Sequence, residues 1–152
     1  MHLVHRAVFV RAAALAVLCA GVLVAAPAWA QSDPEAIANR AVVMEIVTQI
    51  INGRQVELAD QLVDAGMVQH LDRPTEGLAG YKAHYKKIFK RFKDYTLDVY
   101  NVAAEGEIVA VHGRLHGITH GGNKINFNVA DIYRLSGGKL AERWHVRQLI
   151  NQ

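Results

Sequence analysis

Residues 108–135, IVAVHGRLHGITHGGNKINFNVADIYRL, alternate apolar with polar or small side chains on both sides of a glycine-rich turn. A period of two residues places successive side chains on opposite faces of an extended chain. The turn between the two halves, residues 120–123, contains two glycines, which suit a tight reversal. The stretch therefore predicts an antiparallel hairpin of two strands, Ile108–Thr119 and Lys124–Leu135.

Two further alternating segments flank this hairpin. Tyr95–Ala103 precedes it across the turn Glu105–Gly106, and Lys139–Ile150 follows it across the turn Ser136–Gly138. Short glycine turns between consecutive strands favour antiparallel pairing. The second half of the chain is thus expected to form a four-stranded meander.

The first half of the chain carries helical patterns instead. Helices are expected over about residues 34–51, 55–64 and 78–93, with a loop over 69–77. The first helix follows an Asp33–Pro34 cap. Its predicted apolar face consists of Ile37, Ala41, Met44, Val47 and Ile51. Helices followed by a meander predict an α+β domain whose helices pack on one face of a curved sheet.

The first 30 residues have the features of a secretion signal. Basic residues precede the apolar run Ala12–Ala26, and the segment ends on Ala28-Trp29-Ala30. A positive start, an apolar middle and a small-x-small ending are typical of a cleaved signal peptide. An uncleaved membrane anchor is the alternative, but it needs about 20 apolar residues. We expect cleavage after Ala30, a mature domain of residues 31–152, and a periplasmic or secreted location without a stable membrane anchor.

The composition of the mature segment excludes several function classes. Removal of residues 1–30 takes away Arg6, Arg11 and the single Cys19, so the formal net charge of +3 falls to about +1. Without cysteine, the mature domain has no disulfide, thiolate metal site or cysteine nucleophile. Its low charge gives nucleic-acid binding little electrostatic support. The lysines of residues 82–93 are therefore expected to form a solvated face.

Asp131 is the main candidate for a functional side chain. On its strand it shares a face with apolar and aromatic residues: Phe127, Val129, Tyr133 and Leu135. Desolvation there would raise the pKa of the carboxyl group toward neutrality, as a general acid or base requires. The alternative is a buried ion pair with an arginine of a neighbouring strand, Arg114, Arg143 or Arg147. The pattern alone does not distinguish these two interpretations.

The neighbouring strands offer partners for Asp131. Unbroken alternation places Trp144 on the core-facing side of the last strand. In the strand 108–119 both rows contain apolar residues, so the row of His112 and His116 faces either the core or the surface. His112, His116 and His120 are each separated by four residues. Adjacent residues on one face of a strand are two residues apart, so this spacing suits a metal site on a strand poorly. No metal is expected.

Three local signatures and the order of the elements resemble the SnoaL-like branch of the nuclear transport factor 2-like superfamily. The signatures are Met67–His70 with Gly77 following, Ala130–Leu135 and Gly138–Gln148. The resemblance covers essentially residues 37–151. It implies a conical, cystatin-like barrel, in which N-terminal helices pack on a strongly curved, mainly antiparallel sheet and enclose a pocket. It also implies a homodimer formed through the sheet.

The resemblance further implies site residues. Members of this branch include polyketide cyclases that perform intramolecular aldol condensations without a cofactor, with a pocket aspartate as general acid and base. By motif that role falls on Asp131, assisted by His116 or, in the other alignment, His112. The residues expected to contact substrate are His70, Trp144, Tyr85 and Phe127.

The expected function is binding of a small, apolar, carbonyl-bearing molecule, with cofactor-free proton transfer of the cyclase or isomerase kind. Asp131 would remove an acidic proton, and a histidine or the Trp144 ring N–H would stabilise the enolate oxygen. The alternative is a non-catalytic ligand-binding or dimeric interaction module of the same fold, because a fold does not determine a function.

Overall fold

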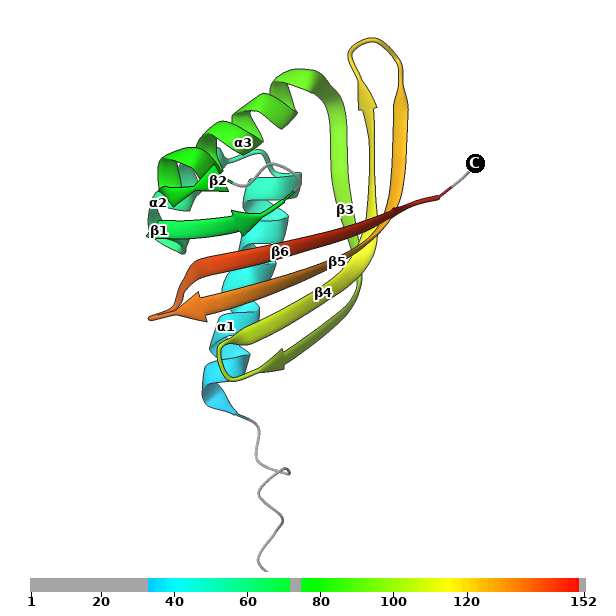
Figure 1. Ribbon diagram of the computed structural model, residues 1–152. Helices are drawn as coiled ribbons and strands as arrows, with labels where there is room; N and C mark the ends of the chain where they lie inside the picture. Colours follow the sequence, from blue (N-terminus) through cyan, green and yellow to red (C-terminus); the bar gives the residue numbers. More distant parts are fainter. Residues whose placement is uncertain (1–32, 72–74, 151–152) are drawn as a thin grey trace, which may run out of the picture. The chain divides into compact units, whose positions relative to one another are not determined.

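The computed structural model describes residues 33–71 and 75–150 (Figure 1). The expected signal segment, residues 1–30, and its cleavage site lie outside the described residues. Within the described ranges, no helix is long and apolar enough to cross a membrane.

The described residues form a mixed sheet with the strand order β2-β1-β6-β5-β4-β3. Antiparallel hairpins join its long strands, β3 (Phe92–Glu105), β4 (Ile108–Thr119), β5 (Lys124–Ser136) and β6 (Lys139–Leu149). β1 (Val63–His70) pairs parallel with β6, and β2 (Thr75–Glu76) pairs antiparallel with β1. The meander predicted from alternation is confirmed, with small shifts at the strand ends.

The second expected helix is wrong in its extent. The chain forms a 3₁₀ turn, η3 (Val56–Leu58), and a single α-helical turn, α2 (Ala59–Leu62), and then enters β1. Met67 and Gln69 of β1 are buried. The stretch Asp64–Gly66 interrupts the alternation, and the pairing with β6 shifts register there. Because its partner strand lies far along the chain, no local pattern marks β1.

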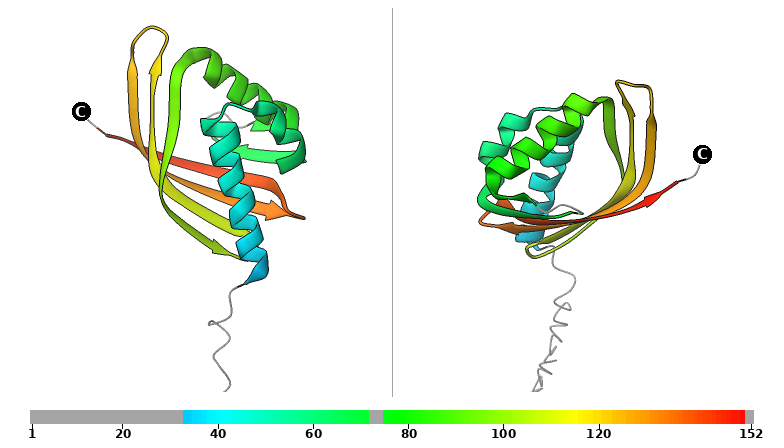
Figure 2. Two further views of the ribbon diagram at one scale, coloured as in Figure 1. Left: turned by 180° about the vertical axis from the view of Figure 1, so that it is seen from behind. Right: turned by 45° about the horizontal axis from the view of Figure 1, so that its top comes forward.

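Helices cover the inner side of the curved sheet (Figure 2). They are α1 (Pro34–Glu45), its π-helical continuation η2 (Ile46–Asn52), and α3 (Gly77–Arg91). Asp33 caps α1, because its Oδ1 accepts a hydrogen bond from the Glu35 amide at 2.9 Å. Its Oδ2 accepts another from the Gly106 amide at 3.1 Å, which fixes the start of α1 against the β3–β4 turn.

The buried face of α1 differs from the predicted one. Ile37 is 58% exposed, whereas Ala36, Asn39 and Val43 are buried. Asn39 is accommodated because its side-chain amide donates to the Gly106 carbonyl at 2.9 Å. Apolar spacing alone cannot predict this face, since a small residue, Ala36, and a hydrogen-bonded amide, Asn39, occupy its first two turns.

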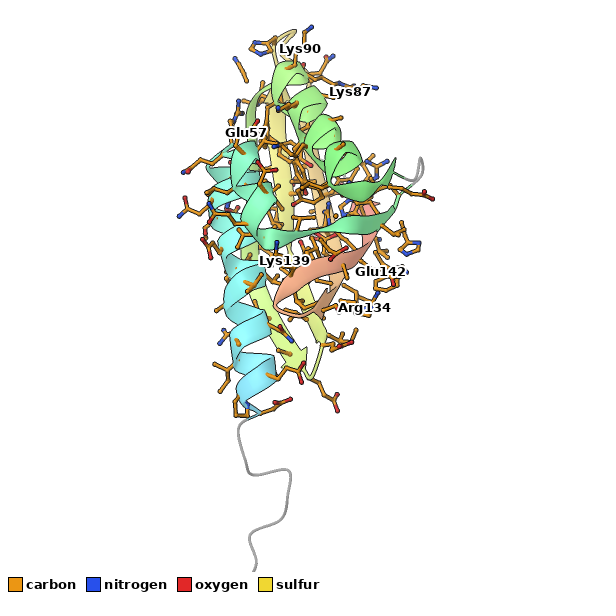
Figure 3. The ribbon with its side chains drawn as sticks, turned by 90° about the vertical axis from the view of Figure 1, so that its left-hand side faces the viewer. Glu57, Lys87, Lys90, Arg134, Lys139 and Glu142 are labelled. Atoms are coloured by element: carbon orange, nitrogen blue, oxygen red, sulfur yellow. The ribbon has the colours of Figure 1, made fainter. Side chains whose placement is uncertain are left out.

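α3 is amphipathic, as expected. Tyr81 and Tyr85 are buried against the sheet. Lys87 and Lys90 are exposed and project from α3 (Figure 3). Lys86 pairs with Glu57 at 2.7 Å, so part of the basic face is neutralised locally.

Two glycines of β4 allow the β3 backbone to approach closely. A Cβ atom on Gly113 would lie 2.2 Å from the Asp98 carbonyl oxygen, and one on Gly117 would lie 2.6 Å from that of Asp94. A larger residue at either position would push β3 away. The α+β fold, with helices on a strongly curved and mainly antiparallel sheet, is confirmed, and the sheet stays open between its edge strands β2 and β3.

Candidate functional site

A β-bulge in β6 determines which of its side chains face the interior. Leu140 pairs with Leu135, but the next pair is Glu142 with Arg134. Ala141 is therefore an extra residue on β6, and an extra residue reverses the alternation that follows it.

The reversal turns the polar row of β6 inward. Arg143 is buried, and the His145 side chain is only 12% exposed. Val146, on the opposite face, is 63% exposed. Trp144 shares that outer face, so its predicted core-facing position is wrong. The prediction assumed unbroken alternation, which the bulge interrupts.

Asp131 lies on the inner face of β5, between the buried side chains of Val129 and Tyr133. It is 1% exposed. Its cross-strand neighbours are Val111 on β4 and His145 on β6. The predicted burial of Asp131 among apolar and aromatic residues is confirmed.

Three side chains contact the Asp131 carboxylate. His145 Nδ1 lies 2.6 Å from Oδ1, Arg143 Nη2 lies 3.1 Å from Oδ1 and 3.0 Å from Oδ2, and the Tyr133 hydroxyl donates to Oδ2 at 3.3 Å. Burial by itself raises the pKa of Asp131, but the charge of Arg143 and the hydrogen bond from His145 outweigh burial and lower that pKa. The expected raised pKa is therefore wrong. Of the two interpretations, the structure contains the ion pair with Arg143.

Arg143 connects Asp131 to α3 and β1. Its Nη1 donates to the Tyr85 hydroxyl at 2.9 Å and to Gln69 Oε1 at 3.4 Å. Gln69 and Tyr85 are themselves buried. Burial opposes the charge of Arg143, but Asp131 more than compensates and the pKa of Arg143 is raised. Both members of the buried pair are thus charged, and helix and strand side chains hold them in place.

A small hollow lies beside this network. Its volume is about 10 Å³, which is enough for one water molecule. Asp131, Arg143 and His145 line it together with apolar and aromatic residues: Ile51, Tyr85, Tyr95, Leu97, Leu115 and Val129. Of the residues expected to contact substrate, Tyr85 lines this hollow and Phe127 does not. A ligand larger than water needs side-chain movement to enter.

His84 of α3 lies near the same network. Its ring packs edge-on against Tyr85, with 5.2 Å between the ring centroids. Burial, with Arg143, His145 and Lys87 nearby, lowers the pKa of His84 to about 4. His84 is therefore neutral at physiological pH.

The histidines of β4 do not reach Asp131. Val111 and Leu115 belong to the buried row of β4, so His112 and His116 lie on the outer face. His116 Nε2 pairs with Asp98 Oδ2 at 3.1 Å and lines a separate groove of about 320 Å³. The prediction that His116 assists Asp131 is wrong, and His145 lies beside the carboxylate instead. In residues 33–71 and 75–150, no three His, Cys, Asp or Glu side chains are grouped to hold a metal ion.

His70 and Trp144 stack on each other on the outer face, with ring centroids 4.8 Å apart. Glu142 Oε2 lies 3.1 Å from His70 Nε2, and Glu142 Oε1 accepts from Arg134 Nε at 3.1 Å. Figure 3 shows Arg134 and Glu142 side by side. The structure therefore does not bring His70 and Trp144 to the hollow, contrary to the prediction.

His145 and Gln69 are the network residues that sequence reasoning missed. Gln69 lies next to His70 in the Met67–His70 signature, and the parallel pairing of β1 with β6 places it opposite Arg143. His145 shares a row with Arg143, the predicted ion-pair candidate. The sequence does contain a signal for His145. If Arg143 is buried in an ion pair, then His145, two residues further along the same strand, faces the interior as well.

The family model described as SnoaL-like polyketide cyclase matches residues 41–152. Among curated proteins, none matches the chain.

Solved structures share the fold at low sequence identity. A protein from Jannaschia sp. CCS1 assigned as a SnoaL-like polyketide cyclase has a TM-score of 0.71 at 19% identity, covering 78% of this chain and 90% of that chain. A SnoaL-like polyketide cyclase from Agrobacterium tumefaciens C58 has a TM-score of 0.64 at 16% identity, covering 72% and 91%. An LEH-like epoxide hydrolase from M. tuberculosis has a TM-score of 0.68 at 12% identity, covering 76% and 86%.

Proposed function

The chain belongs to the SnoaL-like polyketide cyclase family, and on that premise we propose that it binds a small, apolar, carbonyl-bearing molecule and catalyses cofactor-free proton transfer on it. The observation that carries this proposal is the 2.6 Å contact between His145 Nδ1 and Asp131 Oδ1 beside the hollow. A carboxylate paired with an imidazole in a desolvated site is a common arrangement for moving protons.

The lining of the hollow supports an apolar substrate with a single polar function. Leu97, Leu115 and Val129 offer apolar surface, and the hydroxyl of Tyr95 adds a hydrogen-bond donor. Burial raises the pKa of Tyr95, so its hydroxyl keeps its proton at neutral pH. Such a donor can stabilise an enolate oxygen as it forms. In this proposal the Tyr95 hydroxyl stabilises the enolate oxygen, which is the role that the sequence predicts for the Trp144 ring N–H.

A second candidate function is ligand binding without catalysis. Two observations favour it: the charge of Asp131 is already neutralised by Arg143 at 3.0 Å, and the hollow has room for only one water molecule. In that case the network is structural, and a ligand that enters would stabilise the fold without being converted.

Hydrogen–deuterium exchange at the α-carbon of small apolar ketones in D₂O, followed by NMR, tests the proposal. His145→Gln should lower the exchange rate about 100-fold or more, because it removes the imidazole from the Asp131–His145 pair, and a positioned acid–base group contributes at least that factor. His116→Gln is the matched control, since His116 lies on the outer face, and it should leave the rate unchanged. Ketones that raise the melting temperature of the wild type without exchanging would support the second candidate and contradict the first.

We also propose that the domain is exported, on the basis of the apolar run Ala12–Ala26 and the Ala28-Trp29-Ala30 ending. Intact-mass measurement of protein recovered from the periplasm should give a chain that starts at Gln31. A mass that includes residues 1–30, or a lipid attached to Cys19, would contradict this.

A further inference from the structure

The contact between Asp131 and His145 fixes where the imidazole proton lies. Asp131 Oδ1 and His145 Nδ1 are 2.6 Å apart, which two acceptors cannot approach without a hydrogen between them. The other neighbours of the carboxylate, Arg143 Nη2 and the Tyr133 hydroxyl, are both donors. A carboxylate among donors is ionised and only accepts. The hydrogen therefore belongs to His145 Nδ1.

A neutral imidazole that carries its hydrogen on Nδ1 has its lone pair on Nε2. His145 lines the hollow, and within the described part of the chain its Nε2 makes no hydrogen bond. We propose that His145, through Nε2, is the group that takes up the substrate proton, and that Asp131 and Arg143 are positioning residues that hold the Nδ1–H tautomer. This inference rests on the proposed function and moves the base from Asp131 to His145.

Arg143 makes this arrangement rigid. Its Nη2 contacts both oxygens of Asp131, and its Nη1 donates to Tyr85 on α3 and Gln69 on β1. The guanidinium is therefore fixed from three elements, and it fixes the rotation of the carboxylate in turn. A carboxylate engaged by a guanidinium and an imidazole is a poor base, since it would have to give up both contacts to bind a proton.

The groups facing His145 come from every layer of the site. Asp131 Oδ1 on β5 lies 2.6 Å from His145 Nδ1, and Arg143 Nη2 on β6 lies 3.3 Å from the same nitrogen. His84 on α3 is neutral at physiological pH, and Tyr85 and Tyr95 line the same hollow as neutral hydroxyls. The imidazole therefore lies between one negatively and one positively charged side chain, and His84, Tyr85 and Tyr95 around it are uncharged.

The proton transfer balances within this set of groups. The C–H bond next to the carbonyl breaks, its proton binds to Nε2, and its electron pair forms the enolate. The imidazolium ion then lies between the Asp131 carboxylate and the new enolate. Return of the same proton to carbon or oxygen restores the neutral imidazole, and no oxidant or reductant takes part.

NMR on the free, isotopically labelled protein tests the tautomer directly. Long-range ¹H–¹⁵N correlations report which ring nitrogen carries the hydrogen, and we expect Nδ1–H for neutral His145. The ¹³C shift of the Asp131 carboxyl group should keep the value typical of an ionised carboxylate from about pH 5 to about pH 8, because an ionised carboxylate does not titrate there. An Nε2–H tautomer, or an Asp131 carboxyl that titrates in this range, would overturn the inference.

A variant separates positioning by Arg143 from simple structural support. Arg143→Lys keeps the positive charge but removes the planar guanidinium, whose two terminal nitrogens contact Asp131, Tyr85 and Gln69. We therefore expect a mixture of His145 tautomers and a rate of ketone hydrogen–deuterium exchange about 10-fold lower. Arg134→Lys on the outer face is the matched control and should change neither. If Arg143→Lys does not fold, the wild-type spectrum still decides. If the protein exchanges ketone hydrogens but His145 carries its hydrogen on Nε2, this inference alone is contradicted. If His145 carries its hydrogen on Nδ1 but no ketone exchanges, the proposed function is contradicted.

Discussion

At the scale of single residues, the charge state of Asp131 depends on its partners more than on its burial. Burial was predictable, because the alternation of β5 places Asp131 between Val129 and Tyr133. Arg143 was one of three arginines that could pair with it, and the sequence offered no means of choosing among them. With Arg143 at 3.0 Å, the effect of the ion pair exceeds that of desolvation.

The ion pair predicts a large effect of Asp131→Asn on stability. The variant leaves Arg143 buried without a counter-charge, so the free energy of unfolding at neutral pH should fall by about 3 kcal/mol. Urea denaturation of both proteins measures this difference. Asp98→Asn is the matched control, because the Asp98 side chain is 50% exposed and pairs with His116 at the surface. It should change stability by less than about 1 kcal/mol.

The same pair of proteins tests the direction of the pKa shift. The folded pKa of Asp131 is lowered, so its stabilising charge is fully present above the unfolded value of about 3.9 and is lost as the pH falls through the folded value. The stability difference between wild type and Asp131→Asn should therefore be constant near neutrality and shrink only in strong acid. A difference that vanishes already between about pH 5 and about pH 7 would indicate a raised pKa and contradict the ion pair.

At the scale of elements, a strand was predictable from the sequence where its apolar and polar residues alternate without a break. β4 and β5 alternate over many residues and were predicted with nearly the observed ends. β1 was missed because Asp64–Gly66 breaks its alternation and because its parallel partner is distant. Non-local pairing of this kind leaves no periodic signal in a single segment.

The bulge explains why the candidate site was only half predicted. Counted without interruption from the pair Ser136–Lys139, the register would place Trp144 opposite Asp131. The extra residue Ala141 moves that pairing to His145. One residue of slip exchanges the two faces of a strand, and nothing in the local sequence marks the position of the bulge. Trp144 was therefore predicted in the pocket and His145 outside it.

The close approach of β3 and β4 predicts a strong effect of Gly113→Ala. Its Cβ would lie 2.2 Å from the Asp98 carbonyl oxygen, so the β3 backbone must move, at a cost of about 1–3 kcal/mol in the free energy of unfolding. Gly121→Ala in the β4–β5 turn is the control, because the nearest atom to its Cβ would be 3.9 Å away. Thermal unfolding measures both variants. Equal melting temperatures would show that β3 can shift freely and that its close approach does not require glycine at position 113.

At the scale of the whole domain, the outer face of the sheet carries apolar side chains that the helices do not cover. Ile132 is 40% exposed and Val146 is 63% exposed, and their strands β5 and β6 are neighbours. The acidic and basic side chains of Glu142 and Arg134 lie beside them and pair with each other. Apolar residues edged by paired charges resemble the composition of a protein interface.

We propose this face as the contact surface of the homodimer that the family resemblance implies. A second copy placed on it would bury Val146 and Ile132 of both chains, and a stable dimer needs about 800 Å² buried on each partner. Val146→Glu would then place two carboxylates in the interface and should convert the protein to a monomer at micromolar concentration, with the fold retained. Ile37→Glu is the matched control, because Ile37 is 58% exposed on α1, away from the sheet. Sedimentation velocity across a concentration series should show a dimer for the wild type and for Ile37→Glu, and a monomer for Val146→Glu. A monomeric wild type at every concentration, or a dimer that survives Val146→Glu, would exclude this face as the contact between copies.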